Sequence, residues 1–418
     1  MSSQSADDLD GVSIADPKIQ ACPYHFYALM RSQEPVHYDP VTDLWMIAGY
    51  GEVKEVLRNW QVFSSVIDMR TDVGGPDMAE TNELFERHGY IVPDVLSQVD
   101  PPLHTFFRSL VDRTFTAPVV KHMNDYLVDH AHEMIDSFID RGDCNFKEEF
   151  ASPLPLGVIA DQLGAPRSDM ALFRKWTDAI IETLGIMLTP ERRLECTKLM
   201  IEFQHYFVAR IEEKKAAPQD DILSALVAAR HEDGRELTIE ELLALIQQLL
   251  VAGNETTRSH LIACMALLIE HRDLQDLLSR DPALIPKFVE ESLRLESPVQ
   301  GLFRKTKQET VLAGKTIPAG AKLYVCYGSA NRDDVKFPRA EALDIHRSNA
   351  SQHMAFSYGI HRCIGQALAR KELAIGLAAI LERMTNIQLS PQQGPIRHVP
   401  SFILRGIESL HITFDKRA

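Results

Sequence analysis

Apolar residues recur at helical spacing through the middle of the chain, from about residue 103 to residue 300. The flanking regions differ. Residues 36–50 predict two short strands around the turn residues Asp39, Pro40 and Asp43, followed by a helix at 51–59. Residues 306–350 predict short strands and irregular chain, because Gly and Pro interrupt alternating apolar residues. The pattern therefore predicts a mainly helical protein with small β-sheets.

The longest predicted helix begins at Thr238 and continues to about His271. Thr238 and Glu241 have the spacing of a capping box, and at 1.5 Å per residue this helix is about 48 Å long. Its centre, VAGNETTRS at 251–259, is rich in poor helix formers such as Gly and Thr. Two kinds of interpretation stay open: a local opening or bend of the helix, or a structural one, namely a surface weak spot or packing against a neighbouring helix.

Composition limits the classes of function. The 418 residues include 44 Lys and Arg against 59 Asp and Glu, for a net charge of −15, which argues against a nucleic-acid or anionic-lipid partner. No segment reaches the ~18 to 20 apolar residues of a membrane span, and the first residues lack the parts of a signal peptide. We therefore expect a cytoplasmic protein without a membrane anchor.

Because no repeat or linker divides the chain, we expect one compact domain over residues 1–418.

The six cysteines lie far apart without a CxxC pair, which disfavours a disulfide framework or a zinc cluster. Cys363 stands out because it lies in FSYGIHRCIG, at the end of a loop and the start of a predicted helix. The N–H groups and partial positive charge of a helix N-terminus favour a thiolate. Gly359 and Gly365 permit a tight turn and the approach of a flat partner, and Phe356 is placed to shield the sulfur. These features suit an axial thiolate on haem iron.

This segment resembles the cysteine signature of the cytochrome P450 haem-thiolate monooxygenases, F-x-x-G-x-H/R-x-C-x-G. The matching residues are Phe356, Gly359, His361, Cys363 and Gly365. The family commonly has a second glycine after the phenylalanine, where this chain has Ser357. That departure concerns the conformation of the loop and not the ligation. Further family signatures occur in order, so the resemblance covers essentially the whole chain.

A second segment, AGNETT at 252–257, resembles the family's A/G-G-x-D/E-T-T. By that resemblance the long helix opens beside the iron and Gly253 leaves space for oxygen. Thr256 would hydrogen-bond the oxygen, and Glu255 would help to relay protons. The resemblance therefore gives the unusual helix centre a catalytic purpose.

ESLR at 291–294 resembles the family's E-x-x-R, in which Glu291 and Arg294 form a buried pair that supports the cysteine loop. The usual position of a third partner falls near Ala342, so we take Arg347 in its place. The resemblance also predicts His and Arg donors for the two haem propionates. These are His104, Arg108, Arg304 and His361.

By the same resemblance the chain has the cytochrome P450 fold, a single large helical domain with a buried haem b whose iron is bound by Cys363. The apolar substrate would lie above the haem, with the loop from Ser64 to Val99 as the entrance. The substrate contacts expected from the family's positions are Val251, Val299, Leu302 and Phe303, with Phe402 and Ile403 as weaker candidates.

Enzymes of this family insert one atom of O2 into an organic substrate, here by hydroxylation or epoxidation of an apolar small molecule. Because the chain has no flavin or iron–sulfur motif, electrons must come from a [2Fe–2S] ferredoxin and its NAD(P)H-dependent ferredoxin reductase. We expect the ferredoxin to bind on the cysteine side, at a local basic patch. The patch consists of Arg108, Arg113, Arg362 and Lys371. Two alternatives are a peroxide-driven peroxygenase of the same fold and a non-catalytic haem-binding sensor.

Overall fold

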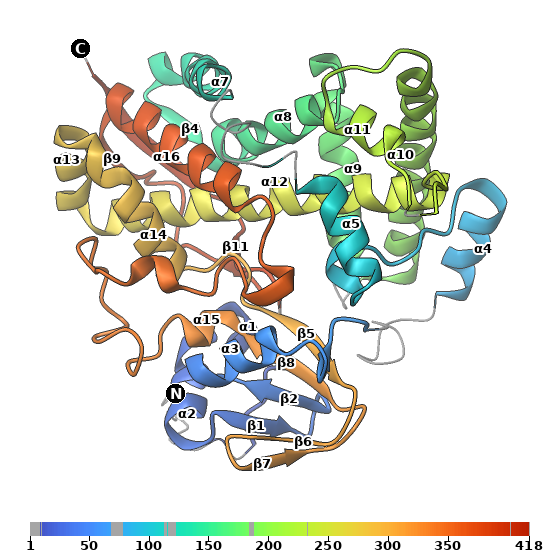
Figure 1. Cartoon of the computed structure of the whole chain (residues 1–418). Coiled ribbons are helices and arrows are strands. Elements are labelled where there is room, and N and C mark those ends of the chain that lie inside the picture. Colours follow the sequence, from blue (N-terminus) through green and yellow to red (C-terminus); the bar gives the residue numbers. More distant parts are fainter. Residues whose placement is uncertain are drawn as a thin grey trace. The chain divides into compact units, whose positions relative to one another are not determined.

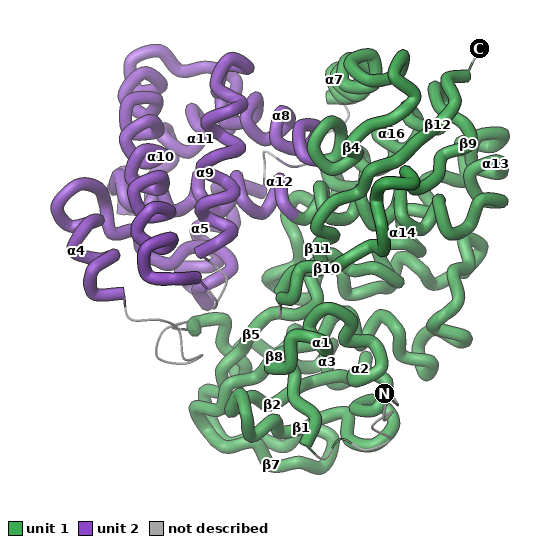
Figure 2. The backbone as a smooth tube through the Cα atoms, turned by 180° about the vertical axis from the view of Figure 1, so that it is seen from behind, with its two compact units in different colours: residues 1–67, 123–151, 256–418 green, residues 68–122, 152–255 purple. Residues whose placement is uncertain are grey.

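The fold is described from a computed structural model, which covers residues 9, 11–67, 78–112, 115, 123–183, 188–231, 233–401 and 403–417. The chain divides into two compact units (Figure 2). Unit 1 comprises residues 1–67, 123–151 and 256–418, and unit 2 comprises residues 68–122 and 152–255. Each unit combines segments that lie far apart in the sequence. The predicted single-domain organisation stays a prediction.

Unit 1 contains a five-stranded sheet with the strand order β1-β2-β8-β5-β3. Its strands are β1 (Val36–Asp39), β2 (Leu44–Ile47), β3 (Phe63–Ser64), β5 (Gly301–Thr306) and β8 (Lys322–Cys326). Strands β1 and β2 pair antiparallel, and β2 runs parallel to β8. The two strands predicted within residues 36–50 are therefore confirmed, and their turn is closed by Asp39 Oδ1, which accepts the Val41 N–H at 2.9 Å.

Smaller sheets complete the strands of unit 1. They are β4 (Asp143–Asn145), β12 (His411–Lys416) and β9 (Met384–Leu389) in one sheet, β6 (Thr310–Leu312) with β7 (Lys315–Ile317), and β10 (His398–Val399) with β11 (Gly406–Ile407). Helices dominate residues 103–300 as predicted, but the sequence analysis did not predict the short strand β4 within them. Its three residues show no alternation of their own, and they are held in a sheet by β12 from the far end of the chain.

The helices of unit 1 include α1 (Pro17–Ala21), α2 (Tyr24–Gln33), α3 (Tyr50–Arg58), α7 (Asn124–Asp136), α13 (Arg272–Arg280), α14 (Ile285–Leu295), α15 (Tyr327–Ala330) and α16 (Gln366–Arg383). In Figure 1, α1, α3 and α15 lie along one side of the five-stranded sheet of unit 1, and β6 and β7 lie at its outer edge. Short 3₁₀ turns are η2 (Ile139–Arg141), η5 (Pro282–Leu284), η6 (Ala350–Gln352) and η7 (Gly359–His361), and η3 (Lys147–Ala151) is a π-helical turn. The helices predicted at 51–59 and after Cys363 are confirmed as α3 and α16.

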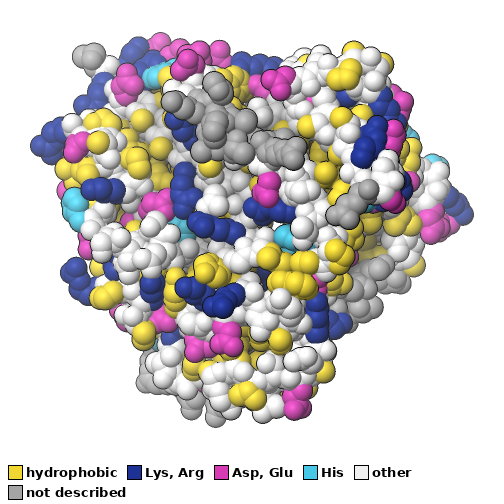
Figure 3. All heavy atoms as spheres, viewed as in Figure 1, with side chains coloured by type: hydrophobic (Ala, Val, Ile, Leu, Met, Phe, Trp, Pro, Cys, Tyr) yellow, Lys and Arg dark blue, Asp and Glu magenta, His cyan; other side chains and the backbone are white. Residues whose placement is uncertain are grey.

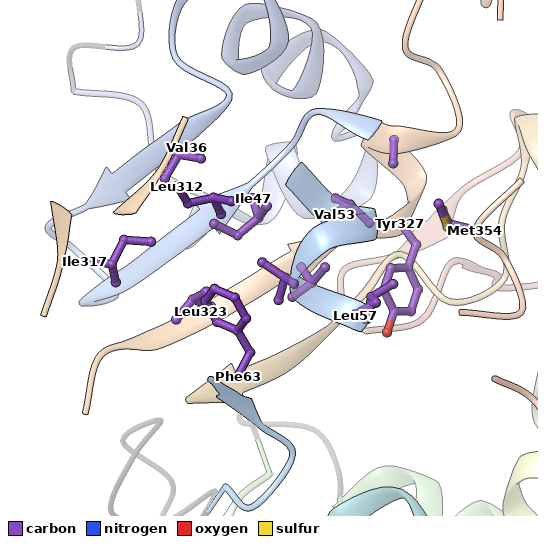
Figure 4. Packing of buried hydrophobic residues seen from close by; sticks show 13 residues of the cluster. Val36, Ile47, Val53, Leu57, Phe63, Leu312, Ile317, Leu323, Tyr327 and Met354 are labelled. Atoms are coloured by element: carbon purple, nitrogen blue, oxygen red, sulfur yellow. The ribbon is translucent and has the colours of Figure 1, made fainter. Parts of the chain in front are cut away.

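Apolar side chains from the five-stranded sheet and α3 form one core of unit 1 (Figure 4). Val53 and Leu57 of α3 pack with strand residues such as Ile47. Tyr327 of α15 and Met354, which precedes the cysteine loop, belong to the same cluster. Burial of each large apolar side chain contributes about 1.5–3 kcal/mol. This core therefore fixes one flank of the loop that carries Cys363.

Unit 2 is helical in its described residues. It contains α4 (Ala79–His88), η1 (Leu96–Gln98), α5 (Leu103–Val111), α8 (Pro153–Gln162), η4 (Arg167–Asp169), α9 (Met170–Thr183), α10 (Pro190–Ala216) and α11 (Ile222–Ala228). Aromatic rings pack between α9 and α10, with Trp176 5.1 Å from Tyr206 and 6.0 Å from Phe203 between ring centroids. The mainly helical fold class with small sheets is confirmed. None of the described helices is both long and apolar enough to span a lipid bilayer.

The segment from Ser64 to Val99, predicted as a long loop, is not all loop, because α4 and η1 lie within it. Helix α4 has only two large apolar residues, so its sequence lacks an apolar stripe. It is supported instead by an ion pair one turn apart between Glu83 and Arg87 and by packing on α10. After the helix, Gln204 of α10 hydrogen-bonds both the N–H and the C=O of Tyr90, at 2.8 and 2.9 Å.

Helix α12 (Ile239–Glu270) is the long helix predicted from Thr238 to His271, and the boundary between the two units falls between its residues 255 and 256. The capping box is confirmed. The Thr238 N–H donates to Glu241 Oε2 at 2.8 Å, and the Glu241 N–H donates to Thr238 Oγ1 at 3.2 Å.

Candidate active site around Cys363

Cys363 lies in a tight turn between η7 and α16. Its N–H donates to the carbonyl oxygen of Phe356 at 2.9 Å, which closes the loop. Gly359 has a φ of +74°, and a Cβ there would clash with the carbonyl oxygen of Leu57, so only glycine fits. A Cβ on Gly365 would meet no atom within 4 Å. The turn therefore leaves open space directly beside the segment that carries the thiol.

Cys363 is partly exposed, whereas most of the other thiols are not. The buried cysteines are Cys144, Cys196, Cys264 and Cys326. Burial raises the pKa of the Cys264 thiol to about 12 and the pKa values of the Cys144 and Cys326 thiols even further. These three stay protonated and serve as small core side chains. Cys22 is exposed but follows α1 without a glycine-bounded turn. Cys363 is therefore the thiol best placed to bind a ligand.

Ser357 occupies the position where the family commonly has glycine, and its φ is +59°. A side chain in this left-handed region costs about 1–2 kcal/mol. The Ser357 hydroxyl lies 3.2 Å from the Tyr327 hydroxyl, and this hydrogen bond offsets part of the cost. The serine thus keeps the backbone conformation that a glycine would adopt.

The Glu291–Arg294 pair is fully buried on α14. Arg294 donates from Nε and Nη2 to the two carboxylate oxygens at 2.8 and 2.7 Å, and from Nη1 to the Asn331 carbonyl at 2.9 Å. Arg347 Nε donates to Glu291 Oε1 at 3.0 Å, so the structure brings together all three predicted members. Ala342 contributes only its carbonyl, which accepts from Arg294 Nη2 at 3.0 Å. Each charge has several partners, which a buried ion pair requires.

The centre of α12 remains α-helical over residues 251–259, so the opening expected there is not present. Residues 251–259 include poor helix formers, and packing against a neighbouring helix compensates for their low helix propensity. A Cβ on Gly253 would lie 3.4 Å from Ile159 of α8, so the glycine allows the two helices to approach closely. Glu255 is buried, whereas Thr256 is only partly buried and lies one turn after the exposed Ala252. The proposed space for oxygen at Gly253 stays a prediction.

Glu372 of α16 is a buried carboxyl that the sequence interpretation missed. It is hydrogen-bonded to Thr257, the neighbour of Thr256 on α12. Burial raises its pKa to about 8, although the bond from Thr257 acts in the opposite direction. A signal existed in the sequence, because position 372 lies between Leu368 and Gly376 on the buried stripe of α16.

The four predicted propionate donors lie on three elements. His104 and Arg108 are one turn apart on α5, and the pKa of His104 is lowered, first by burial and then by the charge of Arg108. Arg108 Nε donates to Asp112 Oδ1 at 2.7 Å. Arg304 on β5 is buried, and its Nη1 donates to the Phe303 carbonyl at 2.7 Å. His361 lies on η7, two residues before the cysteine, and is partly buried.

The predicted substrate contacts have structural partners. Val299 and Leu302 pack against the core cluster of unit 1, and Phe303 lies 5.4 Å from Tyr324 between ring centroids. Val251 on α12 is partly buried. Their contact with a substrate stays a prediction.

Of the two weaker candidates, the Ile403 carbonyl accepts the Gln300 N–H at 2.7 Å. Phe402 lies outside the described residues.

A groove of about 1200 Å³ runs beside the cysteine loop in unit 1. It is lined by residues of α3, the chain that follows it, and the loop: Gly51, Lys54, Glu55, Arg58, Asn59, Trp60, Gln61, Tyr358, Gly359, Ile360 and Arg362. Lys54 Nζ lies 5.1 Å from the centroid of the Tyr358 ring. The sequence interpretation included Arg362 but missed Lys54 and Arg58, which are exposed one turn apart on α3. Their signal was a basic pair one turn apart on the exposed side of α3, beside the stripe of Val53 and Leu57.

The other predicted basic residues do not line this groove. Lys371 is partly buried on α16, Arg108 belongs to unit 2, and Arg113 lies outside the described residues. On the face shown in Figure 3, basic side chains are interspersed with acidic and apolar ones.

Comparison with known sequences gives one family. Residues 171–281 and 283–411 match the family described as Cytochrome P450. A protein of Bacillus subtilis (strain 168) named Cytochrome P450 is 32% identical over 94% of each chain. Cytochrome P450 monooxygenase PikC of Streptomyces venezuelae is 35% identical over 95% of this chain and 92% of the relative. A Steroid C26-monooxygenase of Mycobacterium tuberculosis (strain CDC 1551 / Oshkosh) is 32% identical over 81% of this chain and 92% of the relative.

Solved structures agree. Cytochrome P450 CYP109Q5 from Chondromyces apiculatus matches with a TM-score of 0.85 and 31% identity, over 97% of this chain and 98% of that one. CYP109E1 from Bacillus megaterium, in complex with testosterone, matches with a TM-score of 0.81 and 33% identity, over 95% of this chain and 99% of that one.

Proposed function

Because the chain belongs to the cytochrome P450 family, we propose that it is a monooxygenase in which Cys363 is the axial ligand of haem b and an apolar small molecule is hydroxylated or epoxidised. The observation that carries this proposal is the turn at Cys363. Its partly exposed thiol lies between two glycines, one required by a positive φ and the other facing open space.

The residues present fit a haem. Gly365 leaves room for a flat ring beside the thiol. The predicted propionate donors have suitable chemistry, because guanidinium forks and neutral imidazole N–H groups both donate to carboxylates. In unit 1 these donors are Arg304 and His361. When bound, haem supplies the one-electron chemistry of iron and the activation of O2.

Protons are proposed to pass through Thr256 and Glu255. A hydroxyl both donates and accepts hydrogen bonds, so Thr256 can transfer a proton without a net change in its own charge. Its neighbour Thr257 is hydrogen-bonded to Glu372 of α16, and we propose a structural role for this second threonine. The two adjacent threonines thus differ in role, which provides a matched pair for experiment.

The substrate is proposed to be apolar and in the size range of a steroid. All four candidate contacts, Val251, Val299, Leu302 and Phe303, are hydrocarbon side chains, which select apolar ligands. Among the relatives, one is named for steroid oxidation and another was solved with testosterone.

Electrons are proposed to come from a [2Fe–2S] ferredoxin and its NAD(P)H-dependent reductase. The groove beside the cysteine loop is the proposed binding surface, because it combines Lys54, Arg58 and Arg362 with the loop that carries the ligand. A cluster of positive charge steers an acidic partner toward this face.

The proposal is tested by reducing the haem-loaded protein under carbon monoxide. We expect the long-wavelength Soret band of a thiolate ligand in the unsubstituted protein and in the control Cys22→Ser, and its loss in Cys363→Ser. A protein without this band would contradict the assignment of Cys363.

Turnover is then measured with ferredoxin, reductase and a panel of apolar compounds. Coupled NAD(P)H oxidation and a hydroxylated or epoxidised product are expected. A product formed with hydrogen peroxide but not with the electron-transfer partners would identify a peroxygenase. Substrate binding without any product would identify a sensor.

A further inference from the structure

A second ion cluster contacts the cysteine loop, separately from the Glu291–Arg294 network. Arg370 of α16 donates from Nε to Glu290 Oε1 at 2.5 Å and from Nη2 to Glu290 Oε2 at 3.1 Å, so both carboxylate oxygens are held by one guanidinium. His353 Nε2 lies 3.4 Å from Glu290 Oε2, and its side chain is only 1% exposed. The cluster therefore joins α14, α16 and the chain just before the cysteine loop.

The protonation states in the cluster follow from its hydrogen bonds. His353 Nδ1 accepts the Ala355 N–H at 3.1 Å, so the imidazole carries its proton on Nε2, which faces Glu290. Burial lowers the pKa of His353, which keeps the ring neutral. Burial would raise the pKa of Glu290, but the nearby His353 ring and the two hydrogen bonds from Arg370 hold it at about 2. The cluster thus contains one anion and one cation and is neutral overall.

The cluster reaches Cys363 through Phe356. The Arg370 guanidinium carbon lies 4.4 Å from the centroid of the Phe356 ring, and the His353 ring is 5.6 Å away at an interplanar angle of 44°. The Phe356 carbonyl accepts the N–H of Cys363 at 2.9 Å. Two members of the cluster therefore contact the ring of the residue whose backbone closes the turn of the ligand.

We propose that Glu290, Arg370 and His353 hold Phe356 in place and balance the electrostatic potential at the Cys363 thiolate. They are positioning residues, because they act through Phe356. A planar guanidinium that is bound to both oxygens of a carboxylate and stacked on a ring has little freedom to move, so the ring keeps one position. The inference rests on the proposed role of Cys363 as haem ligand.

The test measures the one-electron reduction potential of the haem-loaded, full-length protein in two variants. Arg370→Gln leaves the Glu290 carboxylate without its cation, which makes reduction harder. Glu290→Gln leaves the Arg370 guanidinium without its anion, which makes reduction easier. At an effective dielectric near 20, a whole charge at a separation of about 12 Å shifts the equilibrium constant for reduction by about tenfold. We therefore expect shifts of this size in opposite directions.

The matched control is Arg383→Gln, which removes an arginine from the same helix, paired at the surface with Asp136 at 2.7 Å. Its potential should equal that of the unsubstituted protein. Arg370→Lys keeps the charge but cannot bind both oxygens and stack at once. It should keep the potential but convert faster from the long-wavelength to the short-wavelength carbon monoxide form, because Phe356 is held less firmly.

Shifts of the same sign in Arg370→Gln and Glu290→Gln, or potentials equal to the Arg383→Gln control, would overturn the proposal and leave a purely structural link between α14 and α16. If Arg370→Gln does not fold, Glu290→Gln must still raise the potential and Arg370→Lys must still preserve it. Absence of the thiolate-type spectrum in the unsubstituted protein would instead refute the ligation by Cys363.

Discussion

The buried carboxyl of Glu372 is hydrogen-bonded to the hydroxyl of Thr257, and this bond joins the helix that follows Cys363 to the long helix α12. Burial raises the pKa of Glu372 from 4.5 to about 8, so the carboxyl is protonated in the folded protein at neutral pH. Burial of Glu372 therefore makes the stability depend on pH, while its bond to Thr257 links α16 to α12.

The first prediction concerns stability against pH. Between pH values near 4.5 and 8 the unfolded chain has lost the proton of Glu372 while the folded protein retains it. The free energy of unfolding therefore falls as the pH rises through this window, by up to about 1.4 kcal/mol per pH unit. Glu372→Gln should remove this slope.

The measurement is the thermal midpoint at several pH values within that window. The control is Glu382→Gln on the same helix, where the side chain is 70% exposed, and it should keep the slope of the unsubstituted protein. An equal pH dependence in all three proteins would show that Glu372 ionises normally.

The second prediction uses the two adjacent threonines. Thr256→Val removes the hydroxyl proposed to relay protons, so we expect electron consumption to continue while product per NAD(P)H falls severalfold. Thr257→Val removes the partner of Glu372, so it should lower the thermal midpoint but leave the coupling near its original value. Product and NAD(P)H are measured in the same reaction. Equal coupling in the two variants would refute the assignment of the relay to Thr256.

The pattern of apolar residues correctly predicted those helices and strands whose apolar spacing and capping residues lie within the segment itself. The long helix is found within one residue of its predicted ends at Thr238 and His271, because both the capping box and the apolar stripe lie within the segment itself. Strand β4 and helix α4 were missed, because each depends on a distant partner, β12 for the one and α10 for the other.

In the candidate site, too, features specified by adjacent residues were predicted and features that depend on distant contacts were missed. Cys363 was predictable because its turn is specified by adjacent residues. The burial of Glu372 has a signal in the apolar stripe of α16, but its contact with Thr257 and that of Arg370 with Glu290 have none, because the partners lie far away in the sequence. For the α12 centre the sequence left two interpretations open, and the close packing of Gly253 on α8 agrees with the one that expected contact with a neighbouring helix.

The third prediction concerns the network around Glu291. Arg347 is 6% exposed and donates to Glu291 Oε1, so Arg347→Gln leaves a buried carboxylate with one cation fewer. Breaking a buried ion pair typically costs about 3–5 kcal/mol. We expect a loss of this order in the free energy of unfolding, measured with urea, together with a lower yield of haem-loaded protein. The control Arg339→Gln changes a residue that is 80% exposed, and it should alter stability by less than about 0.5 kcal/mol. Equal losses in the two variants would contradict the network.

The fourth prediction concerns the left-handed backbone at Ser357. In a Tyr327→Phe background the hydroxyl partner is gone, so only the conformational cost remains. Ser357→Gly should then raise the free energy of unfolding by about 0.5–1 kcal/mol, whereas Ser357→Ala should not raise it. Thermal unfolding of the three proteins decides the point. An alanine variant as stable as the glycine variant would show that the strain is absent.

The fifth prediction concerns the groove beside the cysteine loop, where Lys54 and Arg58 are exposed on α3. Reversing both charges, as Lys54→Glu with Arg58→Glu, places acidic groups against an acidic ferredoxin, so we expect the KM for ferredoxin to rise at least severalfold at low ionic strength. Added salt screens both the original attraction and the new repulsion, so the difference in KM between variant and unsubstituted protein should shrink as salt increases.

Two controls accompany this measurement. Substrate binding, followed by the Soret shift of the ferric protein, should not change, because neither residue is a proposed substrate contact. Lys416→Glu reverses a half-exposed charge on β12 of the same unit and should leave the KM unchanged. The unsubstituted protein, the double variant and Lys416→Glu have the same residues at the proposed haem site. A rise in KM confined to the double variant therefore assigns the ferredoxin-binding surface to α3. Equal KM values in all three proteins would show that ferredoxin binds at another surface.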